Sequence, residues 1–235
     1  MKCNPKQIRC GRLAWAALTA AAFSFSAVAQ PPLLDGLVAY YPLDQVIGTK
    51  TPDKVNGYDM ELQNLTATNL VPGARGLAMQ FNNADQTILK RVSNPGELLP
   101  INQHPALTIA FWANVPTGLS DLRLFSEGNT GNNNPLFNLG TANTGDNGTL
   151  DFYFRQDGWT TVDHLRSVGE PLDGTWHHIA FVQDPEGNRT LYIDGEPDDV
   201  VDPIPPKPEG DWNLNTTPIG PVVRADPNHW LTGPL

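Results

Sequence analysis

Two adjacent histidines, His177 and His178, are the side chains that first suggest chemistry, because imidazole binds metals and transfers protons near neutral pH. They lie in an apolar run typical of a β-strand, where successive side chains point to opposite faces. The pair therefore cannot hold one ion from a regular strand, and we expect a structural role. The other histidines, His104, His164 and His229, are scattered and lack the spacing of zinc ligands.

Carboxylates are the second candidate chemistry, because glycosidases use two of them, roughly 5 to 10 Å apart. On one strand this would need acidic residues at alternate positions, and the sequence has no such run. Glu196, Asp198 and Asp199 come close, but Pro197 favours a loop there. The sequence also lacks a nucleophile elbow, a zincin helix and a phosphate-binding loop. We therefore expect no catalysis, with an unusual active site as the alternative.

Oxygen ligands gather in the segment from Asn82 to Ile88. It reads Asn-Asn-Ala-Asp-Gln-Thr-Ile, so that Asp85, Gln86 and further amides precede a predicted strand. Calcium binds six to eight oxygens from carboxylates, amides and carbonyls. Calcium is therefore the cofactor that the sequence suggests, and the alternative is an ordinary polar hairpin loop.

The overall charge excludes some partners. The formal net charge is −10, which argues against nucleic acid and anionic membranes and is compatible with a hard cation. Plain solubility is the alternative reason for this charge. The two cysteines, Cys3 and Cys10, both precede residue 30. Residues 30–235 can therefore form neither a disulfide nor a Cys-ligated zinc site.

Residues 1–29 have the order of a secretory signal peptide. Basic residues precede an apolar run from Leu13 to Phe25, and Ala27-Val28-Ala29 has the small-x-small pattern of a cleavage site. We expect a mature chain beginning at Gln30. A membrane anchor is the alternative, but the run is short for ~30 Å of hydrocarbon. We expect a secreted or cell-envelope protein, extracellular or periplasmic and bacterial, without membrane insertion after cleavage.

Residues 30–235 read as one all-β domain, with short apolar runs between turn clusters and no helical period. In Leu107–Val115 and Leu150–Arg155 apolar residues alternate, as in strands with one buried face. Further strands are expected over Leu37–Leu43, Leu77–Phe81, Gln86–Val92, His178–Val182 and Thr190–Ile193. Asp184–Asn188 is expected to close a hairpin, and Gly128–Asn134, Gly140–Gly148 and Pro203–Glu209 to be loops or connectors. This pattern favours an antiparallel β-sandwich.

The run from Leu172 to Val182, with its Trp-His-His, and the run Thr190–Glu196, with Tyr-Ile-Asp-Gly, resemble the characteristic hairpin of laminin G-like domains. Leu107–Val115 and Gly36–Asp44 resemble earlier strands of that family, in the same order. The chain is thus similar to the concanavalin A-like lectin and glucanase superfamily and, distantly, to pentraxins. The resemblance implies a jelly-roll sandwich that binds carbohydrate or an extracellular protein, in binding or adhesion. The alternatives are a carbohydrate-active enzyme, an accessory module of one, or a structural module of a larger surface protein.

The resemblance also implies site residues. Asp85 and Gln86 match the Asp-Asn pair of the pentraxin calcium loop, with Gln in place of Asn, and Asp226 and Asn228 lie in the late loop that supplies further ligands there. Trp159, in a polar turn, is a candidate platform for stacking a sugar, or a core plug.

Residues 228–233 resemble the segment that precedes the final strand of the family, and the chain stops at Leu235. We therefore expect a sandwich that is incomplete at its C-terminus, with an open edge along Leu37–Leu43.

Overall fold

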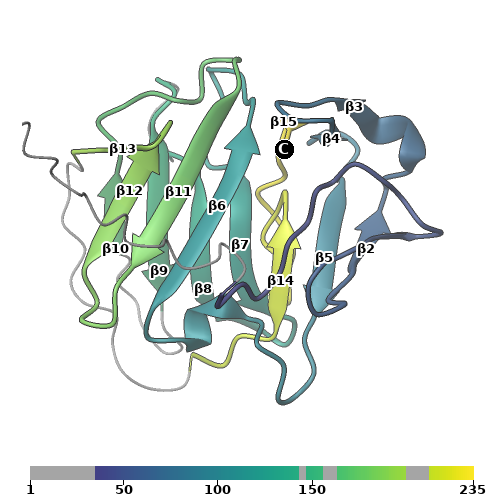
Figure 1. Ribbon diagram of the computed structural model, residues 1–235, viewed down its shortest axis with the longest axis horizontal. Helices are drawn as coiled ribbons and strands as arrows, with labels where there is room; N and C mark the ends of the chain where they lie inside the picture. Colours follow the sequence, from purple (N-terminus) through teal and green to yellow (C-terminus); the bar gives the residue numbers. More distant parts are fainter. Residues whose placement is uncertain (1–34, 143–146, 156–162, 200–211) are drawn as a thin grey trace, which may run out of the picture. The chain divides into compact units, whose positions relative to one another are not determined.

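The computed structural model describes residues 35–142, 147–155, 163–199 and 212–235 (Figure 1). The predicted signal peptide over residues 1–29 and the candidate stacking residue Trp159 lie outside these described residues. From Gly36 to Leu235 the chain packs as one unit. Within the described part, no helix has the length and apolar character that a bilayer span requires.

Strands dominate the described chain, with two short 3-10 helices, η1 (Ala67–Asn69) and η2 (Ile101–Gln103). In chain order the strands are β1 (Lys50–Thr51), β2 (Met60–Gln63), β3 (Leu70–Pro72), β4 (Leu77–Phe81), β5 (Ile88–Val92), β6 (Leu107–Ala113), β7 (Arg123–Asn129), β8 (Asn132–Thr141), β9 (Leu150–Arg155), β10 (Asp163–Arg166), β11 (His177–Gln183), β12 (Arg189–Ile193), β13 (Glu196–Pro197), β14 (Thr216–Ile219) and β15 (Gly233–Pro234).

The strands form two layers. The large sheet has the order β1-β2-β5-β14-β7-β8-β9-β10, and it is faced by the sheets β13-β12-β11-β6 and β15-β4-β3. Figure 1 shows β6, β11 and β12 in front of the large sheet. All described strand pairs are antiparallel, which confirms the predicted antiparallel sandwich.

Strand β14 joins two halves of the large sheet that are far apart in sequence. Ile219 pairs with Leu89 of β5 on one side and with Phe125 of β7 on the other. Without this late strand, β1, β2 and β5 would have no described ladder to the rest of the sheet.

Aromatic side chains fill the space between the layers. Phe152 of β9 stacks on Phe181 of β11 with ring centroids 4.0 Å apart, and Phe137 of β8 contacts both rings edge-on. These three rings are almost fully buried. Such aromatic pairs add about 0.5–1.5 kcal/mol each to the burial of apolar area, so they hold β8 and β9 flat against the opposite layer.

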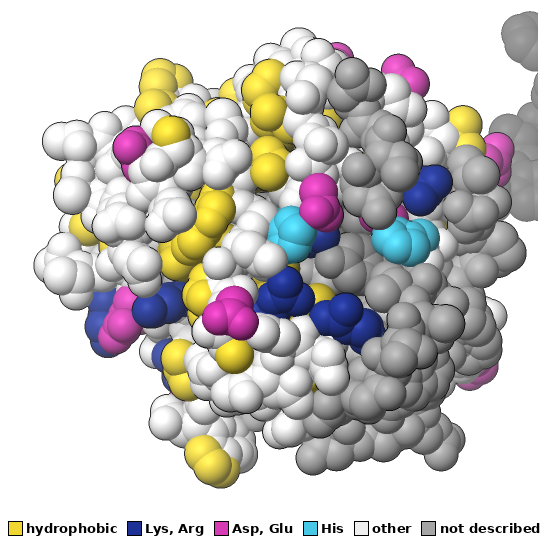
Figure 2. Space-filling model, turned by 180° about the vertical axis from the view of Figure 1, so that it is seen from behind, with side chains coloured by type: hydrophobic (Ala, Val, Ile, Leu, Met, Phe, Trp, Pro, Cys, Tyr) yellow, Lys and Arg dark blue, Asp and Glu magenta, His cyan; other side chains and the backbone are white. Residues whose placement is uncertain are grey.

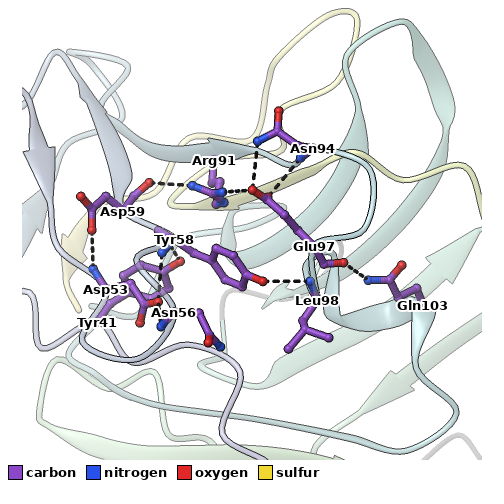
Figure 3. A network of polar contacts seen from close by, with 10 residues as sticks. All are labelled: Tyr41, Asp53, Asn56, Tyr58, Asp59, Arg91, Asn94, Glu97, Leu98 and Gln103. Atoms are coloured by element: carbon purple, nitrogen blue, oxygen red, sulfur yellow. Dashed lines mark hydrogen bonds and ion pairs between the residues drawn. The ribbon is translucent and has the colours of Figure 1, made fainter.

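A network of polar contacts fastens the loops beside β2 and β5 (Figure 3). At its centre is the Asp53 carboxylate. It accepts hydrogen bonds of 2.7 to 3.1 Å from the backbone N–H groups of Tyr40, Val55, Asn56 and Tyr58. Burial alone would raise the pKa of Asp53, but these N–H donors outweigh burial and lower the pKa below 3.8.

Arg91 of β5 ties this turn to the next loop. Its guanidinium lies 2.5 Å from the Glu97 carboxylate and 4.7 Å from the centre of the Tyr58 ring. Glu97 in turn accepts hydrogen bonds from the backbone and the side chain of Asn94. The Tyr58 hydroxyl accepts from the Leu98 N–H. Charge, ring and backbone contacts therefore connect residues 53–59 with residues 91–98.

The prediction of a strand over Leu37–Leu43 is wrong. The N–H of Tyr40 donates to the Asp53 carboxylate and its carbonyl accepts from Lys54, so a turn takes the bonds that a ladder would need. Leu43 has a φ of 55°, which breaks the extended backbone. The expected final strand would lie past Leu235 and stays a prediction.

Strand predictions that rested on alternating apolar residues are confirmed, whereas one loop prediction is wrong. Gly128–Asn134 contains the end of β7 and the start of β8, since Asn129 pairs with Asn132 across a tight turn. β8 then continues to Thr141, into the expected loop Gly140–Gly148. The connector Pro203–Glu209 lies outside the described residues.

Candidate functional site

Polar side chains gather on the outer face of the large sheet, over β8, β9 and β10. Alternation sends Phe137 and Phe152 inward, so Asn138 and Asp151 point outward. The register then aligns Asn138 with Tyr153 and His164, and Gly140 with Asp151 and Arg166. Residues directly opposite each other in a ladder share a face. We call Asn138, Asp151, His164 and Arg166 the outer-face cluster.

A buried acid–imidazole pair forms one side of this cluster. Asp151 is 2 % exposed, and Nδ1 of His164 lies 2.9 and 2.8 Å from its two carboxylate oxygens. Burial raises the pKa of Asp151, and the contacts with His164, Arg123 and Arg166 offset this only in part. The carboxylate is thus costly to keep charged and useful to a ligand that can hydrogen-bond to it.

The Asn138 amide is the most unusual group of the cluster. It is 0 % exposed, and neither its nitrogen nor its oxygen has a hydrogen-bond partner among the described residues. In the same row, the neighbouring Ser126 is satisfied, since its hydroxyl donates to the Pro221 carbonyl at 2.7 Å. Nε of Arg166 is also buried and unpaired. A buried polar group without a partner costs about 1–3 kcal/mol, so these groups hold hydrogen-bonding capacity that the described residues leave unused.

Three ionisable residues in mutual contact, Asp121, Arg123 and His229, border the outer-face cluster. Arg123, in the same row as Gly140 and Asp151, contacts the Asp121 carboxylate at 2.7 Å, and His229 contacts the same carboxylate at 3.0 Å. Burial raises the pKa of Asp121, but His229 and Arg123 outweigh burial and lower this pKa to about 2. Figure 2 shows histidine, acidic and basic side chains gathered on this face of the molecule. Asp121 is therefore ionised and balances Arg123.

The predicted calcium residues Asp85 and Gln86 lie in the turn between β4 and β5. The Asp85 carboxylate accepts a hydrogen bond of 2.7 Å from the Asn82 amide. The Asn64 amide donates to the backbone carbonyls of both Asp85 and Gln86. The side-chain amides of Asn82 and Asn64 thus already donate hydrogen bonds to oxygens that could coordinate a cation.

Asp226 and Asn228 lie in a second turn, which crosses the outer face of the large sheet. Asp226 forms two hydrogen bonds with the Asn133 side chain, next to the β7–β8 turn. Asn228 pairs with Val222 through the backbone, and its Oδ1 is buried and unpaired.

The register separates these two predicted pairs. Asp85 precedes the end of β5 that pairs with Ile219, whereas Asp226 lies beyond the other end of β14, where Thr216 pairs with Gly128. The four residues therefore do not fit one calcium site, and each turn offers a single carboxylate. No group of three or more His, Cys, Asp or Glu suited to a metal occurs among the described residues. A calcium site in either turn stays a prediction.

The histidine pair is structural, as expected. Nδ1 of His177 lies 2.7 Å from the Asp194 carboxylate, while the His178 ring packs against Trp112 with centroids 5.3 Å apart. Burial would lower the pKa of His177, but Asp194 and Asp173 outweigh it and raise this pKa. Asp194 also receives the His178 N–H, so the pair closes the turn between β12 and β13.

Sequence reasoning missed Asn138, Asp151 and Arg166 as a site. The usable signal is a polar residue inside an apolar strand: Asn138 stands between Phe137 and Leu139, and Asp151 between Leu150 and Phe152. Such a residue faces away from the core. His164 was considered only as a metal ligand, because its partner Asp151 is on another strand.

Residues 90–222, more than half of the chain, match a laminin G family described as the concanavalin A-like lectin/glucanases superfamily. No curated protein is similar enough to count as a relative.

Among solved structures, the chain is similar to the binding domain of botulinum neurotoxin serotype C1, with 16 % identity and a TM-score of 0.55 over 77 % of this chain and 42 % of that one. It is similar to the binding domain of botulinum neurotoxin DC in complex with rat synaptotagmin II, with 16 % identity and a TM-score of 0.53 over 77 % and 43 %. A type C neurotoxin whose cell entry depends on two ganglioside molecules gives 16 % identity and a TM-score of 0.52 over 77 % and 42 %. The chain thus spans about two fifths of these toxin chains, and at this identity the similarity concerns the fold.

Proposed function

Because the chain belongs to the concanavalin A-like lectin/glucanases superfamily, we propose that it is a secreted, non-catalytic binding module that takes carbohydrate on its outer-face cluster. The observation that carries the proposal is the Asn138 amide, buried and unpaired in the row next to the buried Asp151 carboxylate. Binding sites place a few polar groups on a rigid scaffold. Three hydrogen-bonded strands, held by the aromatic core beneath them, provide such a scaffold.

The chemistry of the cluster suits hydroxyl groups. A sugar hydroxyl donates one hydrogen bond and accepts two, and the cluster offers acceptors at Asp151 and Asn138 and donors at Asn138 and Arg166. Ligand hydroxyls would satisfy groups that the described residues leave unpaired. One of the similar toxin domains is in complex with synaptotagmin II, and cell entry of a type C toxin depends on interaction with two ganglioside molecules. This supports carbohydrate first and an extracellular protein second as partner.

We also propose that calcium stabilises the fold by binding in the turn that contains Asp85. Carboxylate and carbonyl oxygens of this turn are the kind of ligand calcium prefers. The Asn64 amide uses one lone pair of the carbonyl oxygens of Asp85 and Gln86, and each of these oxygens has a second lone pair for an ion. In this proposal the ion stabilises the turn, and the sugar contacts stay with the outer-face cluster.

A carbohydrate-active enzyme is the second candidate, and one observation favours it. Burial raises the pKa of Asp151, which is the property of a general acid. However, Nδ1 of His164 lies within 2.9 Å of both oxygens of Asp151, so a proton there faces the imidazole. Binding without hydrolysis is therefore the better account of this carboxylate.

A glycan array probed with the exported protein, with and without calcium, tests the proposal. We expect binding to a restricted set of glycans, and at least tenfold weaker binding for Asp151→Asn at unchanged thermal stability. Asp184→Asn is the matched control, because Asp184 lies in the exposed β11–β12 loop and bonds only within it. Absence of binding to every glycan would contradict the proposal. Release of reducing sugar that Asp151→Asn abolishes would establish the enzyme instead.

A further inference from the structure

We propose that His177 is a pH-dependent latch between two turns at one end of the β13-β12-β11-β6 sheet. When charged, the ring holds both turns, and when neutral, it releases the turn that contains Asp173. The latch goes beyond the proposed function, because it involves no residue of the outer-face cluster. It follows from three features: a carboxylate at each ring nitrogen, a hydroxyl that can bond to either partner, and the nitrogen that must lose its proton first.

Each nitrogen of the His177 ring faces a carboxylate from a different turn. Nδ1 lies 2.7 Å from Oδ2 of Asp194, in the β12–β13 turn, and Nε2 lies 3.3 Å from Oδ1 of Asp173, in the turn before β11. Strands β11, β12 and β13 are neighbours in one sheet (Figure 1). Only the imidazolium has a proton on both nitrogens, so only the charged ring can donate to both turns.

The hydroxyl of Thr175 supplies the alternative bond. Its Oγ1 donates to Oδ1 of Asp173 at 2.7 Å and lies 3.0 Å from Nε2 of His177. A hydroxyl has one proton and can turn it to either acceptor. While Nε2 is protonated, the hydroxyl proton points to Asp173. Once Nε2 is bare, the hydroxyl proton can point to Nε2 instead.

The proton on Nε2 is the one that leaves as the pH rises, because Nδ1 has the shorter contact with a carboxylate. Nδ1 keeps its proton, Nε2 gives its proton to water, and Thr175 then donates to Nε2. Of its three donors, Asp173 thus loses Nε2 of His177 and the Thr175 hydroxyl, and it keeps the Thr175 N–H at 2.8 Å. The β12–β13 turn stays bonded, since Asp194 keeps Nδ1 and the His178 N–H.

The charges around the ring set where this change occurs. Among the described residues, the titratable groups that face the ring are Asp173 and Asp194, with His178 next along the strand. Burial would lower the pKa of His177, but Asp194 and Asp173 outweigh burial and raise this pKa above 6.5. Hydrogen bonds, chiefly from the Thr175 hydroxyl, lower the pKa of Asp173. The His178 N–H does the same for the pKa of Asp194, so both carboxylates stay ionised while the ring titrates.

The sign of the effect on stability follows from the raised pKa. The latch stabilises the fold below pH 6.5, and this contribution is lost as the pH rises through the folded-state value. Above that value Asp173 keeps one donor, so the turn that contains Gly174 and Thr175 loosens and offers a carboxylate to solvent or to a partner.

Nitrogen-15 NMR of the unmodified protein tests the latch directly. We expect His177 to titrate with a midpoint above 6.5 and, beyond the midpoint, to carry its single proton on Nδ1. Backbone order parameters of Gly174 and Thr175 should fall across the same midpoint, because Asp173 has released the turn.

Two variants separate the turns. Asp194→Asn removes the charge at the shorter contact, so the midpoint of His177 should fall by about one unit and the neutral ring should carry its proton on Nε2. Asparagine also adopts the positive φ of 53° found at Asp194, which preserves the turn. Asp173→Asn should lower the midpoint less and leave the proton on Nδ1. The matched control is Asp184→Asn at the other end of β12, which should leave the midpoint unchanged.

Three results would overturn the latch. A midpoint of His177 at or below 6.5 would show that the carboxylates do not hold the charged ring. A neutral ring protonated on Nε2 would keep Asp173 bonded. Order parameters that stay constant across the midpoint would make His177 a structural link that pH does not control. Failure of the proposed function looks different, because it is measured by glycan binding and leaves the titration of His177 as it is.

Discussion

Two polar regions of this molecule, each with a buried aspartate at its centre, Asp53 or Asp151, differ in how their hydrogen-bonding groups are satisfied. Around Asp53, Arg91 and Glu97, protein groups meet nearly every donor and acceptor, with Nε of Arg91 as an exception (Figure 3). In the outer-face cluster, both polar atoms of Asn138 are unpaired. The first region uses its charges to fasten loops. The second retains hydrogen-bonding capacity that only another molecule can use, which is the better indication of a site.

The largest effect is expected where polar groups are satisfied. Asp53→Ala removes the acceptor of four backbone N–H groups. We expect the free energy of unfolding to fall by about 3 kcal/mol and the melting temperature to fall by roughly 6 to 12 °C. Calorimetry measures this, with Asp53→Asn as the milder control. Glycan binding should persist at temperatures where the variant is folded, and a loss confined to binding would break the comparison.

The pH dependence of stability sharpens the comparison, because folding lowers the pKa of Asp53 and raises the pKa of Asp151. The lowered pKa of Asp53 stabilises the fold above 3.8, and this contribution is lost as the pH falls through the folded-state value. The raised pKa of Asp151 means that the native state holds the proton more tightly, so stability is lost as the pH rises from 3.8 through the folded-state value. Denaturant midpoints between about pH 3 and pH 7 should therefore rise with pH less steeply for Asp53→Asn and more steeply for Asp151→Asn. Parallel curves for the parent and both variants would contradict this.

The smallest effect is expected from calcium. At tenfold excess over the dissociation constant, an ion that binds only the folded state adds about 1.4 kcal/mol, or roughly 3 to 6 °C in melting temperature. Asp85→Ala should abolish this shift. Asp226→Ala should preserve it, because Asp226 lies at the opposite end of the sheet. A melting temperature that does not respond to millimolar calcium would remove the ion from the proposal.

The sequence was sufficient to predict strands in which alternating apolar side chains determine which face is buried. In β6 and β9 apolar residues alternate, and each strand lies within one or two residues of its prediction. It failed over Leu37–Leu43, where the apolar run suggests a strand but the distant Asp53 takes the backbone bonds. It also failed at Asn132–Asn134, where amides that favour turns are carried into β8 by the pairing of Asn132 with Asn129 of β7.

The candidate site could not be predicted from the sequence for a related reason. Asn138, Asp151 and Arg166 belong to three strands and meet only through register, which a one-residue slip would change completely. The calcium prediction has the same weakness, because Asp85 and Asp226 were joined by analogy while the register of β14 separates them. The sequence identifies single candidate side chains, but it does not show which of them lie together in the fold.

The position of β14 has a consequence for the order in which the molecule can be made. Leu89 and Ile219, about 130 residues apart in the chain, are direct partners in the large sheet. A nascent chain therefore leaves the β5 edge without its neighbour until residues 216–219 have been synthesised, and contacts of such long range form slowly. Late closure of the sheet thus leaves an unpaired strand edge on any chain that has not yet reached β14.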